Sequence, residues 1–342
     1  ADGFMLANKL PNHDDLQSIF SKGVTFELGR WGLELIKYIS PNYSMPWFNG
    51  IMLLILIAIS ACLIARILGI KSKVKQCLLG AIMITYSSVT CTMAYMFTAN
   101  SYGIAILLAI LGAYFAIKMN KKLNLILSVI CLILSLSIYQ AYICITATLF
   151  IILLIKDCLK KEENLKNIVL KGLKLLSILI VSLLLYLASV IIVNYITGSS
   201  LGEYQGANSI GSFSITGVVK GILSNYLVLP RLVFRDFYGL SAGILLKIGY
   251  VISFISIFIL AIMCLKRISK VSKGKAVVFV VLGILIPLTM NALYLVNEKL
   301  EMHSLMVYSN LFILVLPLVL INELNKNFEV SKEKTIKYIN NI

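Results

Sequence analysis

The chain has 342 residues, of which 59% are hydrophobic and 13% charged, and its formal net charge is +16. A soluble domain carries about 25% charged residues, so this composition excludes a soluble enzyme. Apolar runs of about 20 residues, each long enough to cross a hydrocarbon core of roughly 30 Å as a helix, recur along the sequence and predict an all-α polytopic membrane protein.

Residues 1–48 precede the first long apolar run and carry two adjacent acids, Asp14 and Asp15. Residues 3–7 resemble the last turns of a helix, which predicts one more transmembrane helix before this stretch in the intact protein. Aspartate is a common N-cap, so the acidic pair has two interpretations. It caps a helix that begins near Leu16, or it performs chemistry.

Residues 26–39 form the next predicted element, an amphipathic helix at the membrane interface. Apolar side chains recur on one face at helical spacing and charged side chains occupy the other, as in interfacial helices. Trp31 and Trp47, the only two tryptophans, fall in or near this stretch, and tryptophan is enriched at membrane interfaces. Arg30 lies on the charged face, where we expect it to pair with Glu34 or to contact a substrate.

Nine apolar runs are long enough to be transmembrane helices. They cover residues 49–68, 77–97, 101–117, 123–138, 140–155, 175–197, 244–265, 276–296 and 303–322, which divides the chain into transmembrane parts 49–197 and 244–322 and a tail at 323–342. With the helix predicted before residue 1, the intact protein has ten.

The range 123–155 differs from the other runs. It holds 33 nearly unbroken apolar residues between lysines, and as one helix it would be about 50 Å long. We therefore predict a short hairpin packed inside the bundle, where protein or water satisfies its backbone. Its turn falls at the polar stretch 135–142, which places Tyr139 and Gln140 near an external cavity. Simple packing within the bundle is the alternative role of these two side chains.

Residues 198–243 form a second large external segment, rich in glycine, serine and aromatic residues. Its Arg231 and Arg235 are four residues apart, so on a helix they share a face. They are candidates to bind a phosphate, or they extend toward lipid headgroups. Glu203 contacts a sugar or is a solvated charge, and a shorter external loop holds His303.

The distribution of lysine and arginine sets the orientation. Twenty-two of the 31 lie in the connections 66–75, 118–122, 156–174, 266–275 and 326–337, which are therefore predicted to be cytoplasmic. The opposite connections hold nine basic and nine acidic residues. The net charge thus reports topology, and no nucleic-acid partner is predicted. No ionisable residue lies deep within a predicted span, which counts against a pump or a symporter.

Four motifs in a fixed order resemble the Gtr-type integral-membrane glucosyltransferases, which add glucose to bacterial O-antigens and other surface polysaccharides. They are Asp14-Asp15, Gly29-Arg30-Trp31, Asn100-Ser101-Tyr102-Gly103 and the stretch 135–142, and the resemblance is clear over about residues 8–155. It implies a GT-C-like bundle in a bacterial plasma membrane, with the active site on the external face. It also implies that an acidic residue of the first external loop is the catalytic group.

No nucleotide sugar is available outside the cytoplasm, so we expect a polyprenyl-phosphate-linked sugar as donor, with glucose and a surface glycan as the sugar and acceptor that the resemblance implies. Transfer needs a base to take a proton from the acceptor hydroxyl and cations to stabilise the departing phosphate. We expect Asp14 or Asp15 to be the base and its neighbour to orient the acceptor. The candidates for substrate binding are Arg30, Tyr139, Gln140, Glu203, Arg231, Arg235 and His303.

The histidines suggest no metal site. His13 and His303 have no third ligand at useful spacing, so no metal and no cofactor beyond the lipid-linked donor is predicted, and assistance by a divalent ion stays open. The expected partners are the donor, the glycan, membrane lipids, and a donor synthase and a small flippase as companions.

Two other functions remain open. A flippase would move the lipid-linked sugar without chemistry and would favour a polar path through the bundle. A polysaccharide polymerase would need an external loop with several basic residues, and residues 198–243 hold only three.

Overall fold

The computed structural model of the chain describes residues 2–8, 14, 24–36, 44–119, 121–203, 215–234, 243–296, 300 and 302–339. Every regular element within these ranges is a helix. Among the residues that the structure describes, eight helices are long and apolar enough to cross a membrane, or nine if the bent pair α6 and α7 counts as one span. The prediction of an all-α polytopic membrane protein is confirmed.

The helices follow one another closely along the chain. In order they are α1 (Gly3–Ala7), α3 (Val24–Glu27), α4 (Trp31–Ile36), α5 (Pro46–Leu68), α6 (Lys73–Thr85), α7 (Ser87–Ala94), α8 (Met96–Ile117), α9 (Lys122–Ile138), the 3₁₀ turn η1 (Gln140–Tyr142), α10 (Ile143–Leu159), α11 (Leu165–Thr197), α12 (Ile215–Phe234), α13 (Ile244–Val271), α14 (Lys273–Met290), α15 (Leu293–Val296), the 3₁₀ turn η3 (Tyr308–Leu311) and α16 (Phe312–Ile339).

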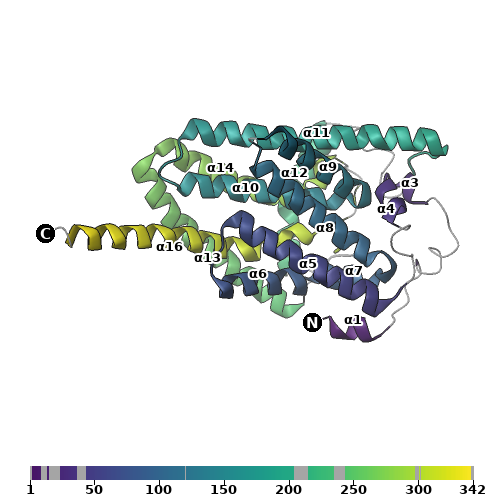
Figure 1. Cartoon of the computed structure of the whole chain (residues 1–342), viewed down its shortest axis with the longest axis horizontal. Coiled ribbons are helices and arrows are strands. Elements are labelled where there is room, and N and C mark those ends of the chain that lie inside the picture. The colour runs from purple at the N-terminus through teal and green to yellow at the C-terminus, as the bar shows by residue number, and fades with distance from the viewer. Residues whose placement is uncertain are drawn as a thin grey trace.

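The bundle has two distinct ends. The short helices α3 and α4 lie at one end, at the right of Figure 1, where the C-terminal part of the long helix α11 reaches over them. Helix α16 projects from the other end toward the C-terminus (Figure 1). These two ends are the reference points for the positions of the candidate site residues.

Small and hydroxylated residues bring α8 close to its neighbours α9 and α10. A Cβ added at Gly112 of α8 would lie 2.7 Å from a methyl carbon of Leu132. The Ser135 hydroxyl of α9 donates to the Ala105 carbonyl at 2.8 Å, and the Thr146 hydroxyl of α10 donates to the Ala109 carbonyl at 2.7 Å. Small residues and hydroxyl groups are the usual means of joining helices in a membrane, and here they fix the hairpin α9–α10 against α8.

The chain reverses within the range 123–155 as predicted, but α9 is not enclosed by the bundle, because its Leu123, Ile126 and Ile130 are exposed. Helix α9 ends at Ile138, Tyr139 is extended, and the 3₁₀ turn η1 leads directly into α10. The backbone therefore reverses at Tyr139 and Gln140, inside the predicted polar stretch. Both residues remain largely shielded from solvent.

The amphipathic helix predicted over 26–39 is not continuous. It breaks at residues 28–30 into α3 and α4, because Gly29 adopts a left-handed conformation with φ of +69°, which glycine tolerates at little cost. Leu33 and Ile36 are buried, whereas Leu35, expected on the apolar face, is 54% exposed. The break shifts the buried face, since α4 starts anew after the turn. Residues 37–39 lie outside the described residues.

The segment predicted as an external loop at 198–243 contains a helix that the sequence analysis did not foresee, α12. Glycine and serine disfavour helices, and here one glycine serves close packing. A Cβ at Gly221 would lie 2.4 Å from the Tyr294 carbonyl oxygen of α15. The Tyr226 hydroxyl donates to the Ile284 carbonyl of α14 at 2.8 Å. These contacts hold α12 against α14 and α15, and its length and hydropathy would suffice to cross a membrane.

Candidate functional site

The turn between α3 and α4 is the starting point of the candidate site. It consists of Leu28, Gly29 and Arg30, and its backbone closes through a hydrogen bond from Arg30 N to the Thr25 carbonyl at 2.8 Å. A Cβ added at Gly29 would lie 2.8 Å from the hydroxyl oxygen of Tyr186 in α11. Glycine is therefore required here for both its positive φ and its lack of a side chain.

Arg30 reaches from this turn to the backbone reversal between α9 and α10. Its Nε donates a hydrogen bond to Oε1 of Gln140 at 3.3 Å. Its guanidinium carbon lies 4.8 Å from the ring centroid of Tyr139, a distance at which cation and ring attract each other. Three residues that the sequence analysis named as substrate-binding candidates, Arg30, Tyr139 and Gln140, are thus brought together.

Gln140 and Tyr186 complete the cluster from the other side. Gln140 Nε2 donates to the Leu28 carbonyl at 2.7 Å and to the Tyr186 hydroxyl at 2.9 Å. The Tyr186 hydroxyl donates to the Gly29 carbonyl at 3.1 Å. These hydrogen bonds form a closed network, and we call Arg30, Tyr139, Gln140 and Tyr186 the Arg30 cluster.

Tyr186 was not among the residues predicted from the sequence, and it lies within the aliphatic run of α11. A signal was present, because Ser182, Tyr186 and Ser189 are spaced four and three residues apart and share one face of a helix. Ser189 of this face accepts a hydrogen bond from Trp31 Nε1 at 2.9 Å. The polar face of α11 thus binds both sides of the α3–α4 turn.

A layer of tyrosines continues from the Arg30 cluster into the bundle. The rings of Tyr102 and Tyr139 are 4.7 Å apart, those of Tyr139 and Tyr142 are 5.0 Å apart, and Tyr142 meets Tyr308 at 6.3 Å. Tyr102 belongs to the stretch Asn100-Ser101-Tyr102-Gly103 singled out in the sequence. The motif at 100–103 therefore packs against the motif at 135–142, which in turn contacts Arg30.

The remaining candidates lie elsewhere or outside the described residues. Glu203 is exposed and follows Gly202, whose N–H donates to the Glu27 carbonyl of α3 at 2.9 Å, so it lies beside the α3–α4 turn. Arg231 is in the last turn of α12, and His303 precedes η3. The contacts described for Arg30 and Gln140 include neither of them. Asp14 is partly buried, whereas Asp15 and Arg235 lie outside the described residues.

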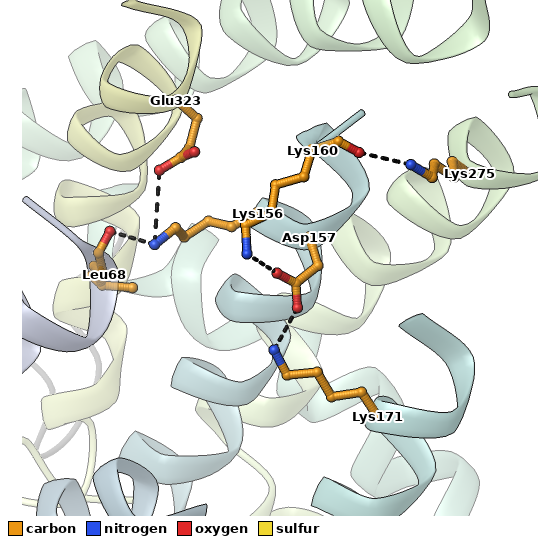
Figure 2. Close-up of polar contacts among 7 residues, drawn as sticks. All are labelled: Leu68, Lys156, Asp157, Lys160, Lys171, Lys275 and Glu323. Atoms are coloured by element: carbon orange, nitrogen blue, oxygen red, sulfur yellow. Dashed lines mark hydrogen bonds and ion pairs between the residues drawn. The ribbon is translucent and has the colours of Figure 1, made fainter. Parts of the chain in front are cut away.

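A second polar cluster lies at the opposite end of α10, about 24 Å from Gln140 at 1.5 Å per residue. Figure 2 shows Asp157 accepting hydrogen bonds from Lys160 and Lys171, both at 2.6 Å, and Lys156 donating to the Leu68 carbonyl. Lys156 also pairs with Glu323 at 3.8 Å. This cluster, which we call the basic end, joins α5, α10, α11 and α16 and includes residues from connections predicted to be cytoplasmic.

Contacts at the basic end show in which direction α11 and α13, the helices before and after α12, run through the bundle. Lys171 is near the start of α11, and Arg267, near the end of α13, donates to the Leu324 carbonyl of α16 at 3.4 Å. Helix α11 thus starts, and α13 ends, at the basic end. At its other end α11 leads to Gly202, which is hydrogen-bonded to Glu27 of α3, so the segment that follows α11 begins at the end where the Arg30 cluster lies.

We expect Asp157→Asn to lower the free energy of unfolding by about 2 kcal/mol. Breaking a fully buried ion pair costs about 3–5 kcal/mol. The expected cost is smaller here because Lys160 and Lys171 are partly exposed and can be solvated by water once the carboxylate is lost. It is not negligible, because the Asp157 side chain itself is only 5% exposed. Thermal unfolding of the purified chain in detergent measures the effect. The exposed Glu162→Gln is the control, and equal melting temperatures for both variants would contradict a stabilising basic end.

Comparison with family models identifies a match over most of the chain. A family model described as "Glucosyl transferase GtrII" matches residues 3–314, which include the Arg30 cluster and most of the bundle. No curated protein and no solved structure matches the chain.

Proposed function

The chain belongs to the GtrII glucosyl transferase family, and from this premise we propose how it acts. It is a membrane glucosyltransferase. We propose that it takes glucose from a polyprenyl-phosphate donor and transfers it to a cell-surface glycan. The proposed location is the outer face of a bacterial plasma membrane.

The Arg30 cluster is the observation that carries this proposal. The guanidinium is held by Gln140 and Tyr139, and within the described part of the chain only its Nε makes a hydrogen bond. The two Nη groups can therefore bind a phosphate in the bidentate manner typical of arginine. In this role Arg30 stabilises the charge that develops on the lipid phosphate as it leaves.

The position of the cluster supports the proposed external face. It lies at the end of α10 away from the basic end, and lysine-rich connections stay in the cytoplasm. A donor on the outer face cannot be a nucleotide sugar, which stays in the cytoplasm, whereas a lipid-linked sugar is held in the membrane by its anchor and can be moved to the outer face. The external position therefore supports a polyprenyl-phosphate donor. A companion synthase attaches the sugar to the lipid, and a flippase moves the product to the outer face.

For the chemical step we propose Asp14 or Asp15 as the base. One carboxylate takes the proton from the acceptor hydroxyl while the hydroxyl oxygen attacks the anomeric carbon of glucose. The bond between that carbon and the lipid phosphate breaks, and the electron pair leaves with the phosphate toward Arg30. The second aspartate orients the acceptor. Glu203 and His303 are proposed to contact the sugar or acceptor, and Arg231 and Arg235 to provide further phosphate contacts.

A transfer assay tests this function directly. Right-side-out membranes from a source strain that lacks the chain, with and without the restored full chain, receive polyprenyl-phosphate [¹⁴C]glucose. We expect chain-dependent label in the surface glycan, and none when UDP-[¹⁴C]glucose is supplied instead. Chain-dependent movement of intact donor across the membrane, with an unlabelled glycan, would contradict transfer and indicate a flippase.

A further inference from the structure

We propose that Tyr186 is a positioning residue for glucose transfer, acting through Gln140 and the α3–α4 turn on the guanidinium of Arg30. This inference rests on the proposed function, because the phosphate contact of Arg30 is part of that function. Tyr186 itself touches no substrate in this scheme. Its hydroxyl determines where the arginine points.

The side-chain amide of Gln140 uses both its nitrogen and its oxygen in hydrogen bonds. An amide nitrogen has two N–H donors, and here one binds the Leu28 carbonyl and the other the Tyr186 hydroxyl. With both donors held on that side, Oε1 must face Arg30 and accept from its Nε. Without the Tyr186 hydroxyl, one donor loses its partner and the amide can rotate away from Arg30.

The same hydroxyl also fixes the backbone that carries Arg30. It donates to the Gly29 carbonyl, one residue before the arginine. Tyr186 is 2% exposed and its ring packs with Leu136 and Val190. The hydroxyl is therefore held in place on a long helix. It fixes the position of the α3–α4 turn and the orientation of the Gln140 amide that is hydrogen-bonded to the guanidinium.

A purely structural role for Tyr186 makes a different prediction. In that case loss of the hydroxyl would destabilise the protein, and its effect on transfer would be the same whether or not Arg30 is present. If the hydroxyl acts through Arg30, its loss should have no further effect once Arg30 is removed. The interaction between two substitutions thus separates positioning from general stability.

The test uses the full chain in detergent, with polyprenyl-phosphate [¹⁴C]glucose and surface glycan from the strain that lacks the chain. We expect Tyr186→Phe to lower kcat by about tenfold, since a small displacement of a group that acts in the transition state is costly, while the donor KM stays within about twofold. In the Arg30→Ala background, Tyr186→Phe should cause no further loss. Gln140→Leu should reproduce the effect and should not add to it.

Ser182→Ala is the matched control, because Ser182 is a buried hydroxyl one turn earlier on α11 that donates to its own helix at Ile178. It should transfer glucose at the wild-type rate. Unchanged transfer in Tyr186→Phe, or an equal loss with and without Arg30, would overturn the positioning role. Full transfer by Arg30→Ala alone would instead contradict the proposed phosphate contact, so the two failures are distinguishable.

Discussion

Replacing Asp14 or Asp15 by Asn, one at a time, is expected to lower the rate of glucose transfer by about 10²-fold or more in at least one of the two variants. A positioned base contributes about 10²–10⁴-fold to such a step, and asparagine cannot accept the proton from the acceptor hydroxyl. The two residues have separate roles in the proposed reaction, so we expect unequal losses. Transfer of radiolabelled glucose to the surface glycan measures both.

Asp157→Asn is the control for the acidic pair, because it makes the same chemical change at the basic end. It should lower stability while keeping the rate per folded molecule. Full transfer by both Asp14→Asn and Asp15→Asn would remove the proposed base. If those variants also unfolded at lower temperature, the pair would be helix caps, each worth about 1 kcal/mol.

Arg30→Ala is expected to lower kcat by about 10²-fold, because removing one group that stabilises developing negative charge costs about 10²–10³-fold. Arg30→Lys should lie between wild type and Arg30→Ala. It keeps the charge but loses both the paired Nη groups and the hydrogen bond from Nε to Gln140. Initial rates at saturating donor measure the effect.

Arg66 provides a matched control for Arg30. It is also an arginine held over a tyrosine, at 5.5 Å from the ring centroid of Tyr114, but it lies in the last turn of α5, near the basic end. Arg66→Ala should leave transfer unchanged. An equal loss in both variants would show that packing against a tyrosine, and not phosphate stabilisation, explains the effect of Arg30.

Much of the fold could be predicted from the sequence, because hydropathy and the placement of lysines indicate each membrane span from a short stretch of residues alone. The reversal at Tyr139 and Gln140 followed from a polar interruption in a run too long for one span. The break at Gly29 did not follow, since Arg30 and its neighbours fit a helical period across it. Helix α12 was missed because glycine is a poor helix former in isolation, whereas Gly221 here allows close packing against α15.

The site was predicted as separate residues and not as an assembly. Arg30, Tyr139 and Gln140 were all candidates, yet their meeting depends on tertiary packing across about 110 residues of chain. Tyr186 was hidden because the aliphatic residues around it dominate the hydropathy of α11. The periodicity of its polar neighbours, rather than composition, would have identified it.

The length of α9 has a consequence for the surrounding lipid. Its 17 residues span about 25 Å, less than the roughly 30 Å thickness of the hydrocarbon core of an average bilayer, and Leu123, Ile126 and Ile130 expose their side chains on its outer surface. Such hydrophobic mismatch is relieved by local thinning of the membrane. In the proposed reaction, thinning beside α9 would bring the outer headgroup layer closer to Arg30. A long-chain phosphate ester can then meet the guanidinium while its tail stays among the acyl chains.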